Sequence, residues 1–438
     1  MTKANIKQAT HASSQPDQPP VNTRGFTGPN QQLWVEVNYK GAKELIEYRR
    51  FVADRSSMWT SLADKGLVII SKAAKASLYD QVESLKEFPP RLIFARPGWC
   101  HGQFVTASGR IFAPKGVQKG AVAFTPDALK CSKKGSHAKW RAEIAQRLTD
   151  HPIPCFFLLT CFAAPMLEVV GRTDNFGFEL AGQGGKGKST TQRLMASVVG
   201  PAMDKDRGYI TTFNMTPAAL EESMLGHSDM PFIIDEANLY GSGEGGRANK
   251  RKMQEFAFQM AGGTTKGRYG NAQQKGYRFI FATSANQPFN QLLGESHTDI
   301  ANAATDRLMS ITVPEGDAGV FGPLPEELQS YRELTLALET AMMRQYGTAM
   351  PKFLSKLVRQ RHTDEAGLKT AIRRRIDEFK REVGINDNNG SDVRVAEAFG
   401  LVYTSFCETS SSCSTVSSAR RTRCSAPSSP VSTSNAAF

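Results

Sequence analysis

One stretch near the middle of the chain has the residue types and spacing of a phosphate-binding loop. The pattern G-x-x-x-x-G-K-[ST] is matched by Gly182, Gly187, Lys188 and Ser189. Glycines let the backbone curl so that several N–H groups point at phosphate oxygens. We expect Lys188 to reach the β- and γ-phosphates and Ser189 to ligate Mg²⁺. The residues expected to bind the nucleotide, taken to be ATP, are Gly182, Gly184, Gly185, Gly187, Lys188, Ser189 and Thr190. The alternative is a glycine linker without a ligand.

An apolar run that ends in two acidic residues supplies the second part of such a site. In MPFIIDEA, Asp235 and Glu236 come directly after residues typical of a buried strand. We expect Asp235 to hold Mg²⁺ through water and Glu236 to act as the general base for the attacking water. Many strands end in Asp-Glu, so this prediction depends on the phosphate loop that precedes it.

Two further residues could act on the γ-phosphate. The strand-like run RFIFATSAN ends in Asn286, whose amide could orient the attacking water or sense the γ-phosphate; an ordinary strand-end turn is the alternative. Arg307 precedes another strand-like run, and arginine stabilises charge on a γ-phosphoryl group, often from a neighbouring subunit. A surface or inter-strand salt bridge is the alternative for Arg307, and Arg268 and Arg278 are rival candidates. The predicted catalytic residues are Lys188, Asp235, Glu236, Asn286 and Arg307.

The periodicity around these residues predicts an α/β fold with a three-layer P-loop NTPase core. FGFELAG is typical of a strand that runs into the loop, and KSTTQRLMASVVG of the helix that follows. An α+β domain precedes this core, and helical segments flank it. The expected parts are a disordered N-terminus (1–30), a small α+β domain (31–130), a helical bridge (131–172), the ATPase core (173–345), a helical C-terminal segment (346–403) and a disordered Ser-rich tail (404–438). Within the α+β domain, residues 41–55 have helical spacing.

The composition limits the classes of protein to consider. The chain has 438 residues, 40% hydrophobic and 22% charged, as in a globular protein of two or three domains. Its seven cysteines lack the spacing of a disulfide or zinc framework, so we expect reduced thiols and a cytoplasmic protein. The apolar run 153–170 contains Pro165, and we interpret it as a buried helix rather than a membrane span. The net charge of +12 favours a polyanion such as nucleic acid, although basic chains without such a partner are common.

The order of these motifs resembles the ATPase cores of AAA+ and superfamily III helicases. The chain is more closely similar to the domain of unknown function 927 family, helicase- and primase-associated ATPases of bacteria, phages and mobile elements. The similarity spans most of residues 90–403 and includes RPGWCHGQFVTASGRIFAP, FAAPMLEVVG, the phosphate loop, the strand ending IIDEAN and KGRYGNAQQKGYRFIFATSAN. The resemblance implies a homo-oligomeric ATPase, such as a hexameric ring, that acts on DNA and on single strands in particular.

The chain departs from the pattern of that family in two places. The last helical segment of the family is missing after Tyr403, where a Ser-rich stretch begins. That stretch is either an out-of-frame translation of a longer parent or a natural tail. No primase or zinc-ribbon domain precedes residue 31, so we expect DNA synthesis to be the task of another chain, a separate primase or replication protein.

The resemblance also suggests a role for two basic segments. GGTTKGRYGNAQQKG carries Lys266, Arg268 and Lys275, with Tyr269 between them. Basic groups can follow phosphates and an aromatic ring can stack on a base, so this segment could be a hairpin that faces a central pore. A solvated loop is the alternative. The same two interpretations apply to the basic segment 245–252, which we expect to be flexible and which holds Arg247, Lys250, Arg251 and Lys252.

Two functions remain open on these grounds. The first is a motor that hydrolyses ATP and moves along or melts DNA in the replication of a phage or mobile element. The second is a switch that hydrolyses ATP slowly and regulates partners in replication control or defence, without unwinding. The same site would serve both, because a fold does not fix its task. A metabolic phosphotransferase lacks support, since an Asp-Glu pair suits attack by water.

Overall fold

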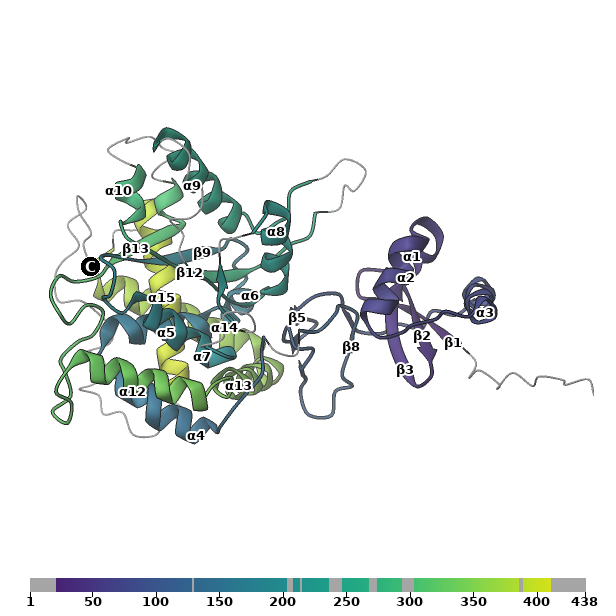
Figure 1. Ribbon diagram of the computed structural model, residues 1–438, viewed down its shortest axis with the longest axis horizontal. Helices are drawn as coiled ribbons and strands as arrows, with labels where there is room; N and C mark the ends of the chain where they lie inside the picture. The colour runs from purple at the N-terminus through teal and green to yellow at the C-terminus, as the bar shows by residue number, and fades with distance from the viewer. Residues whose placement is uncertain are drawn as a thin grey trace, which may run out of the picture. The chain divides into compact units, whose positions relative to one another are not determined.

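A computed structural model gives the architecture of the chain (Figure 1). The structure describes residues 21–127, 130–202, 208–212, 215–235, 246–267, 274–293, 303–385 and 389–410. The chain divides into two compact units, one of Met1–Ile93 with Ala121–Thr125 and one of Phe94–Gly120 with Pro126–Phe438. Among the helices of the described ranges, none has the length and apolar character needed to cross a membrane.

The first unit contains a three-stranded antiparallel sheet and three helices. The strands, in the order β1-β2-β3, are β1 (Asn22–Thr27), β2 (Leu33–Tyr39) and β3 (Ala42–Glu47), and the helices are α1 (Tyr48–Ala53), α2 (Arg55–Asp64) and α3 (Lys72–Ser84). Val35 and Val37 alternate with polar residues along β2 and are fully buried in the core of the unit. Lys40 and Gly41 both have positive φ angles, 52° and 83°, as a two-residue hairpin turn requires.

The second unit is built on a five-stranded parallel sheet. The strand order is β10 (Thr211–Thr212), β11 (Met230–Asp235), β12 (Phe279–Ala285), β9 (Phe176–Ala181) and β13 (Leu308–Thr312). Because the strands are parallel, their C-terminal ends share one edge of the sheet. The chain leaves β9 at this edge, passes through the glycine loop and enters α7 (Lys188–Val199).

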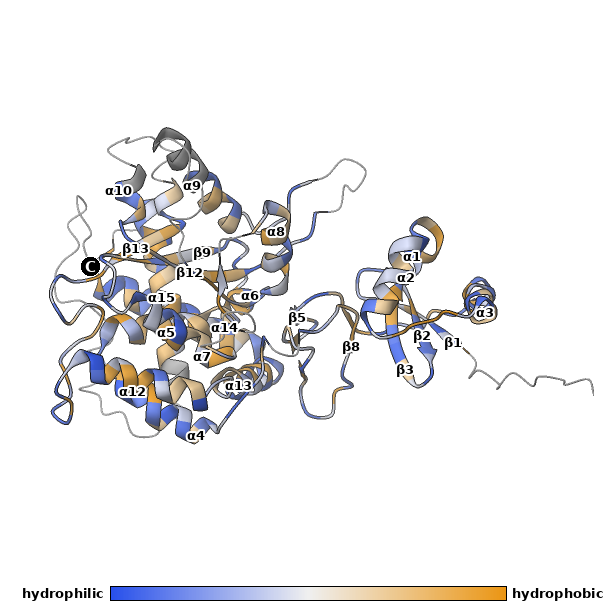
Figure 2. Cartoon of the chain, in the orientation of Figure 1, coloured by the Kyte–Doolittle hydropathy of each residue, from blue (hydrophilic) through white to orange (hydrophobic). Residues whose placement is uncertain are grey.

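Helices cover both faces of this sheet, so the unit has three layers (Figure 1). Ile233 and Ile280 belong to a core shared with α5 (Pro152–Ala163) and α7. The alternate strand residues Phe232 and Phe281 belong to a second core, shared with α8 (Pro217–Gly226) and α9 (Gly246–Ala261). Strands buried on both faces are continuously apolar, which explains the sequence of β11. Figure 2 shows hydrophilic colour on much of the outer helices α4 (His137–Trp140) and α12 (Tyr331–Arg344).

Helices of the C-terminal region complete the second unit. They are α12, α13 (Ala349–Thr363), α14 (Glu365–Glu382) and α15 (Gly390–Ser410). Helix α15 packs on α14 and on α5, where the Ser405 hydroxyl donates to the Leu159 carbonyl at 3.0 Å. The remaining elements are β4 (Ile93–Phe94), β5 (Gly98–Cys100), β6 (Gln103–Val105), β7 (Ile111–Phe112), β8 (Ala121–Val122), α6 (Met166–Val170), α10 (Phe289–Leu293), a π-helical turn (Arg141–Ala145) and a 3₁₀ turn (Gln146–Leu148).

The structure corrects four expectations from the sequence. Strand β1 lies within the stretch 1–30 that we expected to be disordered, because its pairing with β2 stabilises a polar segment. Strand β3 occupies the first half of the expected helix 41–55, because the tight turn at Gly41 returns the chain along β2. Helix α9 begins at Gly246, in the segment expected to be flexible, whose Ala, Arg and Lys residues are good helix formers. Helix α15 continues to Ser410; residues 1–20 and 411–438 lie outside the described part.

Candidate functional site

The loop between β9 and α7 has the backbone conformation that its glycines predict. Gly185 and Gly187 have φ angles of 75° and 89°, in the left-handed region. A Cβ atom on Gly187 would lie 2.5 Å from Cγ2 of Val320, so a larger residue would also clash. The first helical hydrogen bond of α7 runs from the Thr191 N–H to the Gly187 carbonyl at 2.9 Å. The amides before it have no acceptor within the helix and favour an anion at this end.

Lys188 lies at the mouth of this loop. Its ammonium group donates hydrogen bonds to the carbonyls of Gly182 and Gln183, the latter at 2.8 Å. It also donates to Oδ1 of Asn286 at 3.5 Å. Partial burial lowers the pKa of Lys188, and the nearby charge of Asp235 opposes that shift. The predicted phosphate-binding cation is therefore already close to the side chains at the ends of β11 and β12.

The loop opens into a cavity of about 740 Å³, which is within the range of small-molecule sites. Asp235 and Asn286 reach the cavity because they end neighbouring parallel strands. Ser284 connects these two strand ends by donating to Oδ1 of Asp235 at 3.0 Å. The residues that line the cavity are Gly184, Gly185, Lys186, Gly187, Lys188, Ser189, Thr190, Asp235, Ser284, Ala285, Asn286, Asp317, Ala318, Phe321, Tyr331, Arg332 and Thr335. The structure thus brings together the predicted loop residues with Asp235 and Asn286.

The oxygen atoms in this cavity suit Mg²⁺ held together with phosphates and water better than a metal ion whose ligands all come from protein side chains. Within the described ranges, no group of three or more His, Cys, Asp or Glu side chains could hold a metal ion. The cavity offers the hydroxyl of Ser189 and the carboxylate of Asp235. Mg²⁺ is usually held by one or two protein ligands together with substrate phosphates and water. Glu236, the predicted general base, lies outside the described residues.

Among the described arginine candidates, Arg307 and Arg278 do not line this cavity. Arg307 precedes β13, and its carbonyl accepts from the Gly177 N–H near the start of β9. It therefore lies at the edge of the sheet opposite the phosphate loop, where its guanidinium group covers the ring of Phe258 at 5.1 Å. Arg307 therefore does not reach the cavity of its own chain; a role in the site of a neighbouring subunit stays a prediction, as does the alternative of a surface or inter-strand contact. The rival Arg278 is engaged in an ion pair with Asp229 at 2.6 Å, and Arg268 lies outside the described residues.

The basic segment before β12 has a paired stem. Thr264 bridges Gly276 in antiparallel fashion, and the Thr265 N–H donates to the Lys275 carbonyl at 2.9 Å. Lys266 and Lys275 are both exposed on this stem. The antiparallel stem is the geometry expected of a hairpin, while Arg268 and Tyr269 lie outside the described residues, as do the side chains of Arg247, Lys250, Arg251 and Lys252.

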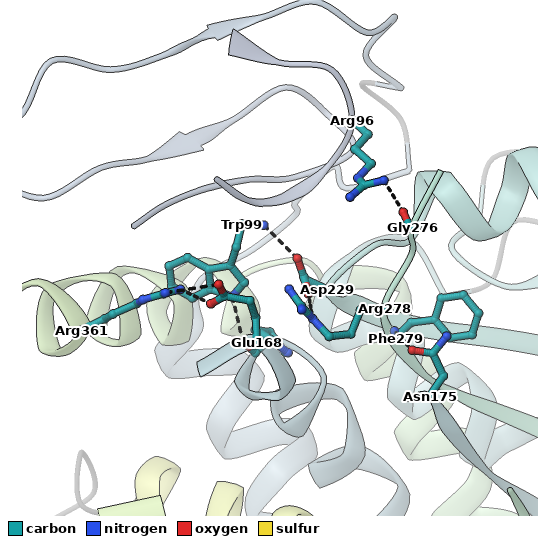
Figure 3. Close-up of polar contacts among 10 residues, drawn as sticks. Arg96, Trp99, Glu168, Asn175, Asp229, Gly276, Arg278, Phe279 and Arg361 are labelled. Atoms are coloured by element: carbon teal, nitrogen blue, oxygen red, sulfur yellow. Dashed lines mark hydrogen bonds and ion pairs between the residues drawn. The ribbon is translucent and has the colours of Figure 1, made fainter. Parts of the chain in front are cut away.

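Polar contacts lie at the base of this hairpin (Figure 3). The guanidinium group of Arg96 donates to the Gly276 carbonyl. Beside it, fully buried Asp229 accepts from Arg278 at 2.6 Å and from the Trp99 N–H at 2.9 Å. Burial raises the pKa of Asp229, and the Arg278 charge opposes that shift. The Asp229–Arg278 ion pair thus anchors the residue at which the stem enters β12.

Two features of the site were not predicted. Glu179, in the middle of β9, has no solvent exposure. Its Oε2 accepts from the Phe289 N–H and from the Ser310 hydroxyl, each at 2.7 Å. Burial raises its pKa to about 7. The sequence feature that could have indicated this buried carboxyl group is the single glutamate inside the apolar run FGFELA. The second feature is the cavity wall that follows β13, which includes Phe321, Tyr331 and Arg332.

Comparisons with known proteins show the family by one match and the fold by another. The model of the family described as "Domain of unknown function (DUF927)" matches residues 31–276. The solved structure titled "SCCmec type IV Cch - active helicase" shares 15% sequence identity, with a TM-score of 0.63 over 91% of this chain and 71% of that chain. The "A form apo structure of NrS-1 C terminal region-CTR" shares 12% identity over 86% of this chain and 83% of that one, but its TM-score of 0.31 supports no argument. No curated protein sequence matches the chain.

The buried carboxyl group of Glu179 predicts a pH dependence of stability. Its pKa is about 7 in the folded chain against an ordinary value of 4.5. Folding therefore favours the neutral carboxyl group. The contribution of Glu179 to the stability of the folded chain is complete below pH 4.5 and is lost as the pH rises through 7. The loss is on the order of 3 kcal/mol. Glu179→Gln, which keeps an acceptor for Phe289 and Ser310, should become more stable relative to the wild type between pH 5 and pH 8 in urea unfolding. An equal stability difference at both pH values would contradict this assignment.

Proposed function

The chain belongs to the family described as "Domain of unknown function (DUF927)", and from this premise we propose that it binds ATP with Mg²⁺ and hydrolyses it as a helicase-like motor on DNA. One observation carries the proposal: the glycine loop, Lys188, Asp235 and Asn286 converge on one cavity. The loop with Lys188, Asp235 and Asn286 come from three different parts of the sequence, and each has the chemistry that a triphosphate site needs. The arrangement supports a P-loop NTPase core.

Different residues of the cavity would bind the phosphates and the Mg²⁺ ion. The loop amides and Lys188 would hold the β- and γ-phosphates, because they concentrate positive charge where the chain leaves β9. Ser189 and Asp235 would hold Mg²⁺, which when bound neutralises charge that develops on the phosphate oxygens. Ser284 would keep the Asp235 carboxylate oriented, since it already donates to Oδ1 at 3.0 Å.

Hydrolysis needs a base, an orienting group and a cation at the γ-phosphate. Glu236 follows Asp235 in the sequence and is proposed as the base that takes the proton from the attacking water. Asn286 would orient this water, which its position 3.5 Å from the Lys188 ammonium group supports. Arg307 would serve the site of a neighbouring subunit, because it lies at the opposite edge of its own sheet. This role requires a homo-oligomer, for which a hexameric ring is the proposed form.

The hairpin before β12 is the proposed contact with DNA. Its exposed Lys266 and Lys275, with Arg268 and Tyr269 between them in sequence, suit a single strand with accessible phosphates and bases. The hairpin continues directly into β12, and Asn286 directly follows that strand, so one element joins the proposed DNA contact to the cavity. The proposed setting is replication of a phage or mobile element, with a separate primase or replication protein as partner.

Removal of the Lys188 ammonium group should abolish turnover. In Lys188→Ala the phosphates lose their main side-chain cation, and ATP hydrolysis should fall by about 100-fold or more. The measurement is steady-state phosphate release with Mg²⁺ present. The matched control is Lys139→Ala, an exposed lysine of α4 that does not line the cavity. Equal rates for Lys188→Ala and the wild type would refute hydrolysis at this loop.

A DNA motor should hydrolyse ATP several-fold faster when single-stranded DNA is added, and this stimulation should weaken as salt rises. The triple variant Lys266→Ala, Arg268→Ala, Lys275→Ala should reduce the ratio of the rates with and without DNA towards one. The exposed lysines Lys133 and Lys139, changed together, provide the control. A wild-type rate indifferent to DNA would favour the alternative, a regulatory or defence-related ATPase switch without unwinding.

A further inference from the structure

The segment between β13 and α12 forms one wall of the cavity and is attached directly to the phosphate loop. The Val320 N–H donates to the Lys186 carbonyl at 3.0 Å, and the Lys186 ammonium group donates to the Gly316 carbonyl at 2.8 Å. A Cβ atom on Gly319 would lie 2.4 Å from the Lys186 carbonyl oxygen, so the two segments touch backbone to backbone. The wall therefore has a fixed position relative to the proposed phosphate site.

Two aromatic rings from this wall border the cavity. The rings of Phe321 and Tyr331 are parallel within 11°, with centroids 6.3 Å apart, and both line the cavity. Phe321 is held from behind by the edge of the His151 ring at 5.5 Å, and the adjacent Gly322 N–H donates to Nδ1 of His151 at 3.0 Å. Phe321 is 8% exposed, whereas Tyr331 is half-buried and offers more of its ring to the cavity.

Tyr331 is also positioned by its helix. It is the first residue of α12, and Ser330 caps that helix by accepting from the Glu333 N–H at 3.2 Å. The Glu333 carboxylate in turn accepts from the N–H of Gln329, the residue before the cap, at 2.8 Å. These two hydrogen bonds fix the first turn, and Arg332 and Thr335 bring further residues of this helix to the same cavity.

The residues that line the cavity are of two chemical kinds. The glycine loop and the strand ends supply amides, a lysine and a carboxylate, which suit phosphates and Mg²⁺. The wall after β13 supplies parallel aromatic rings, a hydroxyl and the exposed guanidinium group of Arg332. A planar, uncharged aromatic group is what such rings bind best, by offset stacking. A nucleoside triphosphate has both parts, a charged tail and a flat base.

We propose that Tyr331, supported by Phe321, stacks on the base of the nucleotide whose phosphates the glycine loop holds. The inference rests on the proposed function and extends it, because it assigns the base-binding side of the site to the segment after β13. The protein would accordingly distinguish a nucleoside triphosphate from a bare triphosphate. A pocket for phosphate alone would need no rings in this wall.

Calorimetric titration with two ligands, Mg²⁺–ATP and Mg²⁺–tripolyphosphate, tests this inference. Tyr331→Ala should weaken ATP binding by about 10- to 100-fold, the usual effect of losing one stacked ring, and leave tripolyphosphate binding unchanged. Tyr331→Phe, which keeps the ring, should bind ATP like the wild type and shows that the position tolerates substitution. Leu336→Ala, a 64% exposed residue of α12 that does not line this cavity, is the control and should bind both ligands normally.

Each outcome separates the inference from the function on which it rests. Unchanged ATP affinity in Tyr331→Ala, or an equal loss for both ligands, overturns the stacking role of Tyr331. Wild-type protein that binds tripolyphosphate as tightly as ATP overturns the base site and leaves the phosphate site intact. Wild-type protein that binds neither ligand overturns the proposed function and this inference with it.

Discussion

The structure depends most on the chain reversal between β9 and α7. A central, fully buried strand ends in a loop whose left-handed glycines turn the first amides of a helix and one ammonium group toward the same space. The amides have no acceptors within the helix, and their partial positive charges add to that of the ammonium group. An anion with several oxygen atoms would accept hydrogen bonds from the amides and would also neutralise the positive charge. The rest of the unit positions side chains around this point.

Parallel strand order explains how residues distant in sequence reach that point. The order β10-β11-β12-β9-β13 places the ends of β11 and β12 beside the loop that follows β9, so Asp235 and Asn286 meet Lys188. The opposite edge carries Arg307, the Asp229–Arg278 pair and the stem of the basic hairpin. Strand β12 has seven residues and connects the two edges over roughly 20 Å. A shift of this strand would move the hairpin and Asn286 together, which would give a physical route from the proposed nucleotide site to the proposed DNA contact.

Much of this site could be predicted from the sequence, because its motifs are local. The glycine pattern, the strand ending at Asp235 and the strand ending at Asn286 each lie within about ten residues of chain, and parallel pairing then brings them together. The wall with Phe321 and Tyr331 could not be predicted, since only the fold brings it to a loop more than a hundred residues earlier. The ionisation of Glu179 also depends on burial by elements far apart in sequence. The sequence singles out Arg307 as a candidate for the γ-phosphate. It does not show at which edge of the sheet Arg307 lies, because that depends on the pairing of Arg307 with Gly177 in a distant strand.

The proposed role of the loop after β9 is to hold the phosphates of a nucleotide. Its most direct test is an experimental structure of the full chain with Mg²⁺ and a non-hydrolysable ATP analogue. We expect β- and γ-phosphate oxygens about 3 Å from the backbone nitrogens of Gly185 to Ser189 and from the Lys188 ammonium group. Well-ordered analogue bound elsewhere, with the loop amides facing only water, would contradict it.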